Sequence, residues 1–355
     1  MKQTGPIGVV GAGSWGSTLA QLLAGAGYEV DLWVFEEELC RTIRETRENN
    51  LYLPGFQLHP SITAHSEIDK VVAGRSLLVM VVPSHVYRLV ARQMLPHLGK
   101  DAIIVSATKG IENDTLLTMS GIWNDILPAR DAVRLASLGG PTFAREVIQQ
   151  IPTAITVAAE DLDTARTVQH VFSTSYFRVY TSLDKIGLEL AGALKNVIAL
   201  AAGASDGLGF GHNTLAALIT RGLAEIARLG VRMGAHPMTF SGLSGVGDLV
   251  LTCTGDLSRN RTVGFKLGQG RKLADILGEM RMVAEGVKTA RSVHFLAQRM
   301  EVDMPISEQV YQVLYEDKDP LQAFRELMER DLKHELEAPW EMWCKKLDLS
   351  DHQPR

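Results

Sequence analysis

The most constraining feature of the sequence is a glycine-rich turn near its start. Residues 7–10 are apolar and β-forming, and the turn Gly11-Ala-Gly-Ser-Trp-Gly16 follows at once. Residues 17–24 have helical periodicity, and residues 29–34 form a second strand-like run. A strand, a G-x-G-x-x-G turn, a helix and a second strand within about thirty residues form the context of a dinucleotide-binding unit. The sequence therefore predicts an α/β fold in which helices flank a parallel sheet.

Each glycine of the turn has a separate physical reason. Gly11 allows the tight turn, Gly13 lets the backbone approach a pyrophosphate, and Gly16 lets the helix pack closely on the strand. The start of the helix adds free N–H groups and a positive dipole end. We expect the turn to contact a dinucleotide through Gly11, Gly13, Ser14, Trp15 and Gly16.

The end of the second strand bears on the choice of cofactor. Phe35 and Glu36 stand where an acid would accept hydrogen bonds from the adenosine ribose and repel a 2′-phosphate. These residues predict NAD rather than NADP. The alternative is that the acids of residues 36–38 charge the first turn of the next helix.

More strands and helices alternate up to about residue 183. The continuous apolar run over residues 77–82 is typical of a parallel strand buried on both faces. Lys109 and the turn over residues 140–144 follow later strands, at the ends where such sheets bind ligands. Lys109 could equally be a solvated loop lysine. His85 and His212 have no ligand-spaced partner, so no metal site is predicted.

From about Asp184 helical periodicity replaces the alternation. The expected domains are residues 1–183, a helical domain over 184–330, and an extension over 331–355 whose role the sequence leaves open.

Residues 187–204 form an apolar helix that should be buried, with Glu189, Lys195 and Asn196 as its polar side chains. Burial lowers the pKa of a lysine toward values useful in acid–base chemistry. Lys195 could instead extend to the surface or pair with one carboxylate. The polar groups disfavour a membrane span.

Two later stretches suit an anionic substrate. Asp248 lies among glycines and aliphatic residues, as a helix cap or as the ion partner of a buried lysine. Ser258, Arg259 and Asn260 open a helix and offer the hydroxyl, forked cation and N–H groups that bind a phosphate monoester.

Composition narrows the class of protein. The formal net charge is −5, which gives no electrostatic reason to expect nucleic acid. Three widely spaced cysteines suit a reducing cytoplasm, and the polar N-terminus passes directly into a strand, without a signal peptide.

Taken together, seven motifs in order resemble NAD(P)-dependent glycerol-3-phosphate dehydrogenase over roughly residues 5–325. They are Gly11–Gly16, Lys109-Gly110, Gly140-Pro-Thr-Phe-Ala144, Leu194-Lys-Asn196, Asp206-Gly-Leu-Gly-Phe-Gly211, Gly247-Asp-Leu249 with Thr252-Cys253, and Ser258-Arg-Asn260.

The resemblance implies a Rossmann-like domain followed by an all-α substrate domain similar to the C-terminal domain of 6-phosphogluconate dehydrogenase. It implies reversible hydride transfer between dihydroxyacetone phosphate with NADH and sn-glycerol 3-phosphate with NAD, in a cytoplasmic homodimer. The product would serve glycerolipid synthesis or redox balance. The implied catalytic residues are Lys195, Lys109, Asp248 and Asn196. Those implied for the substrate are Lys109, Gly140, Thr142, Lys195, Asp248, Thr252, Ser258, Arg259 and Asn260. Those implied for the cofactor, beyond the glycine turn, are Phe35, Lys109, Ala144, Arg259, Val283 and Glu285.

The chain departs from the family pattern at two places. NADP-preferring bacterial members usually carry a basic residue where this chain has Phe35, which again predicts NAD. The extension carries Trp340 and Trp343, which could pack on the body or contact a partner. Two alternative functions remain at this point: a dehydrogenase for another small hydroxy acid, and a non-catalytic sensor that binds NAD(H).

Overall fold

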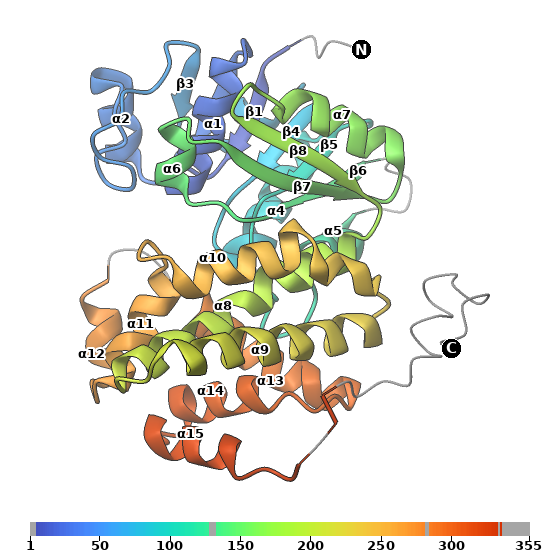
Figure 1. The fold of residues 1–355 in the computed structure, drawn as a ribbon. Coiled ribbons are helices and arrows are strands. Elements are labelled where there is room, and N and C mark those ends of the chain that lie inside the picture. The colour runs from blue at the N-terminus through green and yellow to red at the C-terminus, as the bar shows by residue number, and fades with distance from the viewer. Residues whose placement is uncertain (1–4, 128–132, 281–283, 333, 336–355) are drawn as a thin grey trace, which may run out of the picture.

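An eight-stranded sheet forms the centre of the N-terminal half of the computed structural model, which describes residues 5–127, 133–280, 284–332 and 334–335 (Figure 1). The strand order is β3-β2-β1-β4-β5-β6-β7-β8. The strands are β1 (Ile7–Val10), β2 (Val30–Trp33), β3 (Ile62–His65), β4 (Leu77–Met80), β5 (Ile103–Ser106), β6 (Arg134–Gly139), β7 (Thr153–Ala159) and β8 (Phe177–Ser182).

The pairing is parallel from β3 to β6, in agreement with the predicted doubly wound fold. β7 runs antiparallel to β6, and β8 is parallel to β7, so the far edge departs from a purely parallel sheet. The short strand β3, at the opposite edge, was not predicted; its residues alternate between buried and more exposed positions.

Helices cover both faces of this sheet, as the alternation of its buried side chains requires. Ile7 and Val9 pack with α1, α2 and α7 in one core, whereas Val10 and Leu78 pack with α3, α4 and α5 in another. The helices are α1 (Ser14–Gly25), α2 (Glu37–Thr46), α3 (Ile68–Val72), α4 (Tyr87–Met94), α5 (Met119–Ile126), α6 (Ala144–Ile148) and α7 (Leu162–Phe172).

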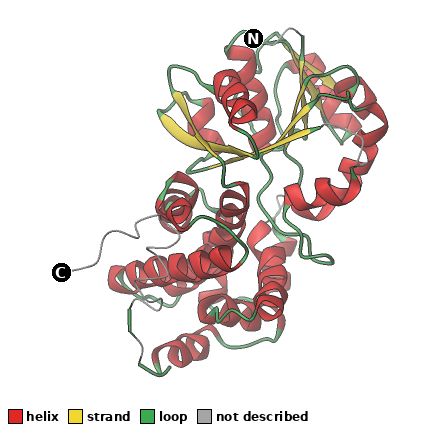
Figure 2. Cartoon of the chain, turned by 90° about the vertical axis from the view of Figure 1, so that its right-hand side faces the viewer, coloured by secondary structure: helices red, strands yellow, loops and turns green. Residues whose placement is uncertain are grey.

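The C-terminal part is helical and lies below the sheet in Figures 1 and 2. Helix α8 runs through its core and ends at Gly207, three residues beyond the helix predicted over residues 187–204. The helices are α8 (Lys185–Gly207), α9 (His212–Arg232), α10 (Asp248–Thr254), α11 (Arg259–Gly268), α12 (Leu273–Gly278), α13 (Glu285–Met300), α14 (Pro305–Tyr315) and α15 (Pro320–Met328).

Helix α11 crosses the buried helix α8 at backbone contact. A Cβ on Gly203 would lie 2.0 Å from the carbonyl oxygen of Arg261, and one on Gly264 would lie 2.0 Å from that of Leu200. Small residues on both helices therefore permit an approach that larger side chains would prevent. α8 is long and apolar enough to cross a membrane, but 89% of its most apolar window is buried inside the protein, as in a core helix.

The change from strands to helices falls between Ser182 and Lys185. The domain limits expected after residues 183 and 330 stay predictions. Most of the extension, including Trp340 and Trp343, lies outside the described residues.

Candidate active site

The glycine-rich turn connects β1 to α1 in a conformation that needs its glycines. Gly11 has a φ of +115°, and a Cβ on Gly16 would lie 1.9 Å from the carbonyl oxygen of Gly11. Gly13 is the N-cap of α1, and nothing lies within 4 Å of where its Cβ would be. Ser14 opens the helix, and Trp15 packs on the core. The turn thus leaves the start of a helix open to phosphate groups, so the residues present fit a dinucleotide.

The end of β2 presents an aromatic ring and an acid beside this turn. Phe35 is 74% exposed and contacts Trp33 edge-on at a ring distance of 6.0 Å. Glu36 is the N-cap of α2, but its carboxylate makes no cap hydrogen bond. It accepts a hydrogen bond of 2.6 Å from the hydroxyl of Tyr52 instead.

A buried cluster of two lysines and one aspartate lies between the sheet and the helical part. The Lys195 ammonium on α8 donates to Asp248 Oδ1 at 2.6 Å and to Thr252 Oγ1 at 2.7 Å. The Lys109 ammonium, beyond the end of β5, donates to Asp248 Oδ2 at 2.8 Å. Both lysines therefore bind the same carboxylate, that of Asp248. The interpretation of Lys109 as a solvated loop residue is wrong.

Asp248 is fully buried at the first position of α10. Its two oxygens bind the two ammonium groups, so it is an ion partner and not a side-chain cap. The stem of Lys109 passes α8 at Gly192, where a Cβ would lie 3.7 Å from Lys109 Cγ. The stem of Lys109 therefore runs alongside α8, one turn before Lys195.

The pKa of Lys195 falls from its ordinary 10.5 to about 7. Burial is the main cause, because it disfavours the charged ammonium, and the nearby Lys109 acts in the same direction. Asp248 opposes both effects by stabilising the ammonium. A side chain that changes protonation near neutral pH is suited to proton transfer.

Two asparagines extend the site from α8 toward α13. Asn260 donates from its amide nitrogen to Asn196 Oδ1 at 2.9 Å, and its own Oδ1 accepts from the backbone N–H of Gly286 at 2.9 Å. Ser258 caps α11 by accepting from the N–H of Arg261. The exposed Arg259 forms no hydrogen bond or ion pair within the described parts of the chain.

The turn after β6 borders the same cluster. The carbonyl oxygen of Gly140 accepts from the Lys109 ammonium at 3.4 Å and from the Thr142 hydroxyl at 3.3 Å. Ala144 opens α6, and its carbonyl oxygen accepts from Thr18 of α1 at 3.3 Å. This turn therefore links the lysine cluster to the helix that follows the glycine turn.

Glu285 joins the two halves of the chain at the start of α13. Its carboxylate accepts from the Ser84 hydroxyl at 2.5 Å and from the Ser84 N–H at 3.3 Å, beyond the end of β4. Burial raises the pKa of Glu285, and the Ser84 donors oppose this rise. Val283, which was predicted beside the cofactor, lies outside the described residues.

Three residues that bind the predicted site residues or the glycine turn were not predicted from the sequence. They are Tyr52, Ser84 and Asn49. Ser84 follows a buried parallel strand, which is a signal that could have marked it. Tyr52 and Asn49 lie in a loop after α2 and carry no such signal. His85 and His212 are exposed, and no group of three metal-binding side chains occurs in the part of the chain that the structure describes.

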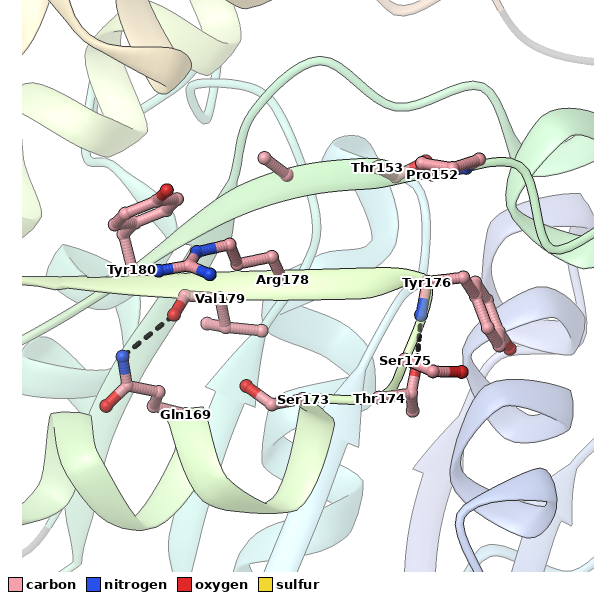
Figure 3. A pocket seen from close by; sticks show the side chains of 11 residues that line it. Pro152, Thr153, Gln169, Ser173, Thr174, Ser175, Tyr176, Arg178, Val179 and Tyr180 are labelled. Carbon is pink, nitrogen blue, oxygen red and sulfur yellow. Dashed lines mark hydrogen bonds between the residues drawn. The ribbon is translucent and has the colours of Figure 1, made fainter.

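A separate groove of about 620 Å³ lies along the edge strand β8 (Figure 3). Arg178 lies over the ring of Tyr180 at 5.1 Å, and Gln169 donates to the carbonyl oxygen of Val179 at 2.8 Å. None of the predicted site residues lines this groove. The lysine cluster therefore stands as the candidate active site.

Comparison with protein families gives two matches that cover most of the chain. Residues 6–165 match the model of the NAD-dependent glycerol-3-phosphate dehydrogenase N-terminus, and residues 184–325 match that of the C-terminus.

Individual relatives agree with this family. The chain is 70% identical to a protein of Syntrophobacter fumaroxidans named glycerol-3-phosphate dehydrogenase (NAD(P)+), over 95% of the chain and 99% of the relative. A Geobacter metallireducens protein of the same name is 60% identical, over 93% and 98%. The crystal structure of glycerol-3-phosphate dehydrogenase from Coxiella burnetii superposes with a TM-score of 0.88 at 37% identity, covering 92% of this chain and 99% of that one.

Proposed function

The chain belongs to the family of NAD-dependent glycerol-3-phosphate dehydrogenases, and from that premise we propose that Lys195 is its general acid and base. The chain is an NAD(P)-linked oxidoreductase that interconverts dihydroxyacetone phosphate and sn-glycerol 3-phosphate. Because both halves of the chain match this family, we set aside the two alternative functions, a dehydrogenase for another small hydroxy acid and a non-catalytic sensor that binds NAD(H).

The observation that carries the proposal is the state of Lys195. It is 5% exposed, its pKa is about 7, and Asp248 holds its ammonium at 2.6 Å. In the direction of reduction, the protonated side chain donates to the ketone oxygen. In the direction of oxidation, the neutral amine accepts the hydroxyl proton. The nicotinamide, when bound, supplies or accepts the hydride.

The residues around Lys195 orient the reacting groups. Lys109 shares Asp248 with Lys195 and adds a second positive charge next to the substrate oxygens. Thr252 accepts from the Lys195 ammonium and so fixes the direction of its remaining protons. Asn196, through Asn260, ties the catalytic helix to the start of α11.

We assign the substrate phosphate to the start of α11. Ser258 and Asn260 stand at the first turn of this ten-residue helix, and the unpaired Arg259 offers a forked cation. A helix N-terminus and a guanidinium both favour a phosphate dianion. Gly140 and Thr142, which lie beside Lys109, would complete the substrate site. Anchoring the phosphate orients the carbon that exchanges hydride.

The cofactor would lie across the glycine turn, with its adenosine at the end of β2. Phe35 offers an exposed ring there, and Glu36 offers an acceptor for ribose hydroxyls. Arg259 and Glu285 would approach the cofactor from the helical part, and Ala144 would do so from the turn after β6. An acid at the end of β2 favours NAD over NADP. Steady-state rates with NADH and NADPH, at saturating dihydroxyacetone phosphate, test this preference, and faster catalysis with NADPH would refute it.

We further propose that the enzyme is a cytoplasmic homodimer whose product serves glycerolipid synthesis or redox balance. Support comes from the family resemblance and from the three widely spaced cysteines. Sedimentation equilibrium at micromolar concentration tests the dimer, and a single species of 38.8 kDa would refute it.

The decisive experiment on Lys195 is the Lys195→Met substitution. We expect at least a ~10²-fold loss of kcat in both directions, as for removal of a general acid. Lys266→Met is the matched control, because Lys266 forms a surface ion pair with Glu279 at 3.0 Å on α11. Turnover of Lys195→Met within a fewfold of this control would exclude Lys195 as the acid–base residue.

A further inference from the structure

The loop between α2 and β3 reaches the proposed adenosine site through one side chain. Tyr52 donates its hydroxyl proton to Glu36 Oε1 at 2.6 Å. We propose that Tyr52 is a positioning residue that sets the preference for NAD by holding the Glu36 carboxylate in place at the end of β2. The proposal rests on the dinucleotide site proposed above.

The carboxylate of Glu36 depends on Tyr52 for its orientation. Glu36 is half-buried and occupies the N-cap of α2, yet its side chain makes no bond to the helix N–H groups. Within the described parts of the chain, Tyr52 is the only side chain that binds this carboxylate. Oε2 remains available as an acceptor for a ribose hydroxyl.

Tyr52 itself remains a donor at working pH. Burial and the neighbouring Glu36 raise the pKa of Tyr52 to about 12. Its hydroxyl therefore stays protonated at neutral pH and can donate to the Glu36 carboxylate.

The loop that carries Tyr52 is tied to the glycine turn. Asn49 is fully buried, and its Oδ1 accepts from the backbone N–H of Tyr52 at 3.0 Å. Its amide nitrogen donates to the carbonyl oxygen of Ala12 at 2.7 Å and to Ser17 Oγ at 2.8 Å. Asn49 and Tyr52 therefore connect the turn that would receive the pyrophosphate to the acid that would receive the ribose.

The rest of the loop is anchored as well. Leu53 and Leu58 are 3% and 4% exposed, and the N–H of His59 donates to Gln21 of α1 at 2.7 Å. Gly55 donates its N–H to Glu48 Oε1 at 2.7 Å. Tyr52 thus projects from a fixed support.

The orientation of the Glu36 carboxylate should affect the binding of NAD and of NADP differently. Held by Tyr52, Glu36 presents its open oxygen to a ribose hydroxyl and its charge to a 2′-phosphate. Without the tyrosine hydroxyl, the carboxylate can rotate toward solvent, beside the 74% exposed Phe35. That rotation would lose a ribose acceptor and relieve the repulsion of a 2′-phosphate.

The test is Tyr52→Phe, which removes one oxygen and keeps the ring. We expect the ratio of kcat/KM for NADH to kcat/KM for NADPH to fall roughly five- to tenfold, the usual worth of a net hydrogen bond. The KM for NADH should rise, whereas kcat and the KM for dihydroxyacetone phosphate should stay within twofold of wild type. Tyr28→Phe is the control, because Tyr28 is another partly buried tyrosine packed on the same core.

A double-mutant cycle separates positioning from stability. In a Glu36→Ala background, Tyr52→Phe should leave the cofactor ratio unchanged, because its effect passes through the lost carboxylate. An equal fold loss with both cofactors together with a lower Tm would mean a purely structural role and would overturn the proposal. So would a full effect in the Glu36→Ala background.

The measurements distinguish a failure of the predicted cofactor preference from a failure of the proposal for Tyr52. A wild-type enzyme that prefers NADPH would overturn the predicted cofactor together with this inference. An unchanged ratio in Tyr52→Phe, with a wild type that prefers NADH, would overturn this inference alone.

Discussion

Replacing Asp248 with asparagine should move the pH dependence of catalysis without changing the shape of the site. Asparagine keeps the size of the side chain and one oxygen, but removes the negative charge that lies 2.6 Å from the Lys195 ammonium and 2.8 Å from that of Lys109. Two ammonium groups would then face each other with no anion between them. Both changes favour the neutral form of Lys195.

The size of the effect follows from the charge that is removed. At 2.6 Å and an effective dielectric constant of about 20, two unit charges attract by roughly 6 kcal/mol, an upper limit because solvent and Lys109 compensate in part. A neighbouring opposite charge generally changes a pKa by about 1 to 3. We therefore expect the pKa of Lys195 to fall from about 7 to roughly 4–6 in Asp248→Asn.

The effect of pH on kcat/KM has opposite signs for reduction and for oxidation. Reduction needs protonated Lys195, so kcat/KM for dihydroxyacetone phosphate falls as pH rises through about 7 in the wild type. In Asp248→Asn this fall should occur at the lower pKa, and at pH 7.5 the reduction rate should be roughly ten- to several hundred-fold lower. Oxidation needs the neutral amine, so its acid limb should move to lower pH.

The assay is the pH profile of kcat/KM in both directions, read from NADH absorbance between pH 4.5 and 9. Asp256→Asn is the control, because Asp256 is a 95% exposed carboxylate that pairs with Arg261 at the surface. An equal loss in both directions, with the limbs left near pH 7, would refute the assignment of the titrating group to Lys195.

Three further predictions concern packing, a buried acid and the contact between the two halves. Gly264→Ala should lower the free energy of unfolding by about 1–3 kcal/mol, because its Cβ would lie 2.0 Å from the carbonyl oxygen of Leu200; urea unfolding measures this. Glu225→Ala should lower the free energy of unfolding by about 3 kcal/mol in the same assay, because it leaves two N–H groups at the start of α14 without an acceptor. Burial raises the pKa of Glu225 from 4.5 to about 7, so wild-type stability relative to Glu225→Gln should fall as pH rises across that window. Ser84→Ala should raise the KM for NADH roughly two- to tenfold by releasing Glu285, with the KM for dihydroxyacetone phosphate unchanged.

Each of these predictions has a result that contradicts it. Gly278→Ala adds a methyl group where nothing lies within 4 Å, so equal losses for this variant and Gly264→Ala would deny the crowding at the helix crossing. A rise in the stability of the wild type relative to Glu225→Gln as pH rises would mean that Glu225 ionises more readily in the folded chain. A rise in the KM for dihydroxyacetone phosphate alone would place Glu285 with the substrate.

The sequence predicted the elements that local pattern determines. The glycine turn, the buried strands and the apolar α8 are each encoded within a few neighbouring residues. The antiparallel β7 was not predictable in the same way, because strand direction depends on how the chain returns after β6. β3 was missed because its four residues alternate in exposure and lack the continuous apolar run of the central strands.

The site shows the same division. Lys195 and Lys109 could each be proposed from the sequence, but their shared contact with Asp248 spans 53 and 139 residues of chain. Only the tertiary fold brings such distant positions together, and the cap alternative for Asp248 could not be dismissed without it. Tyr52 shows the limit most clearly, since a tyrosine in a loop gives no pattern that would point to Glu36.

The acid–base character of Lys195 follows from its burial on α8. Lys195 is 5% exposed, and exclusion of water from its ammonium is the main reason that its pKa falls. Burial and the neighbouring Lys109 both favour the neutral amine. Asp248 restores part of the charged form, so its position between the two lysines keeps the pKa near neutrality. A pKa near neutrality lets one side chain donate a proton in reduction and accept one in oxidation, which a reversible dehydrogenase requires.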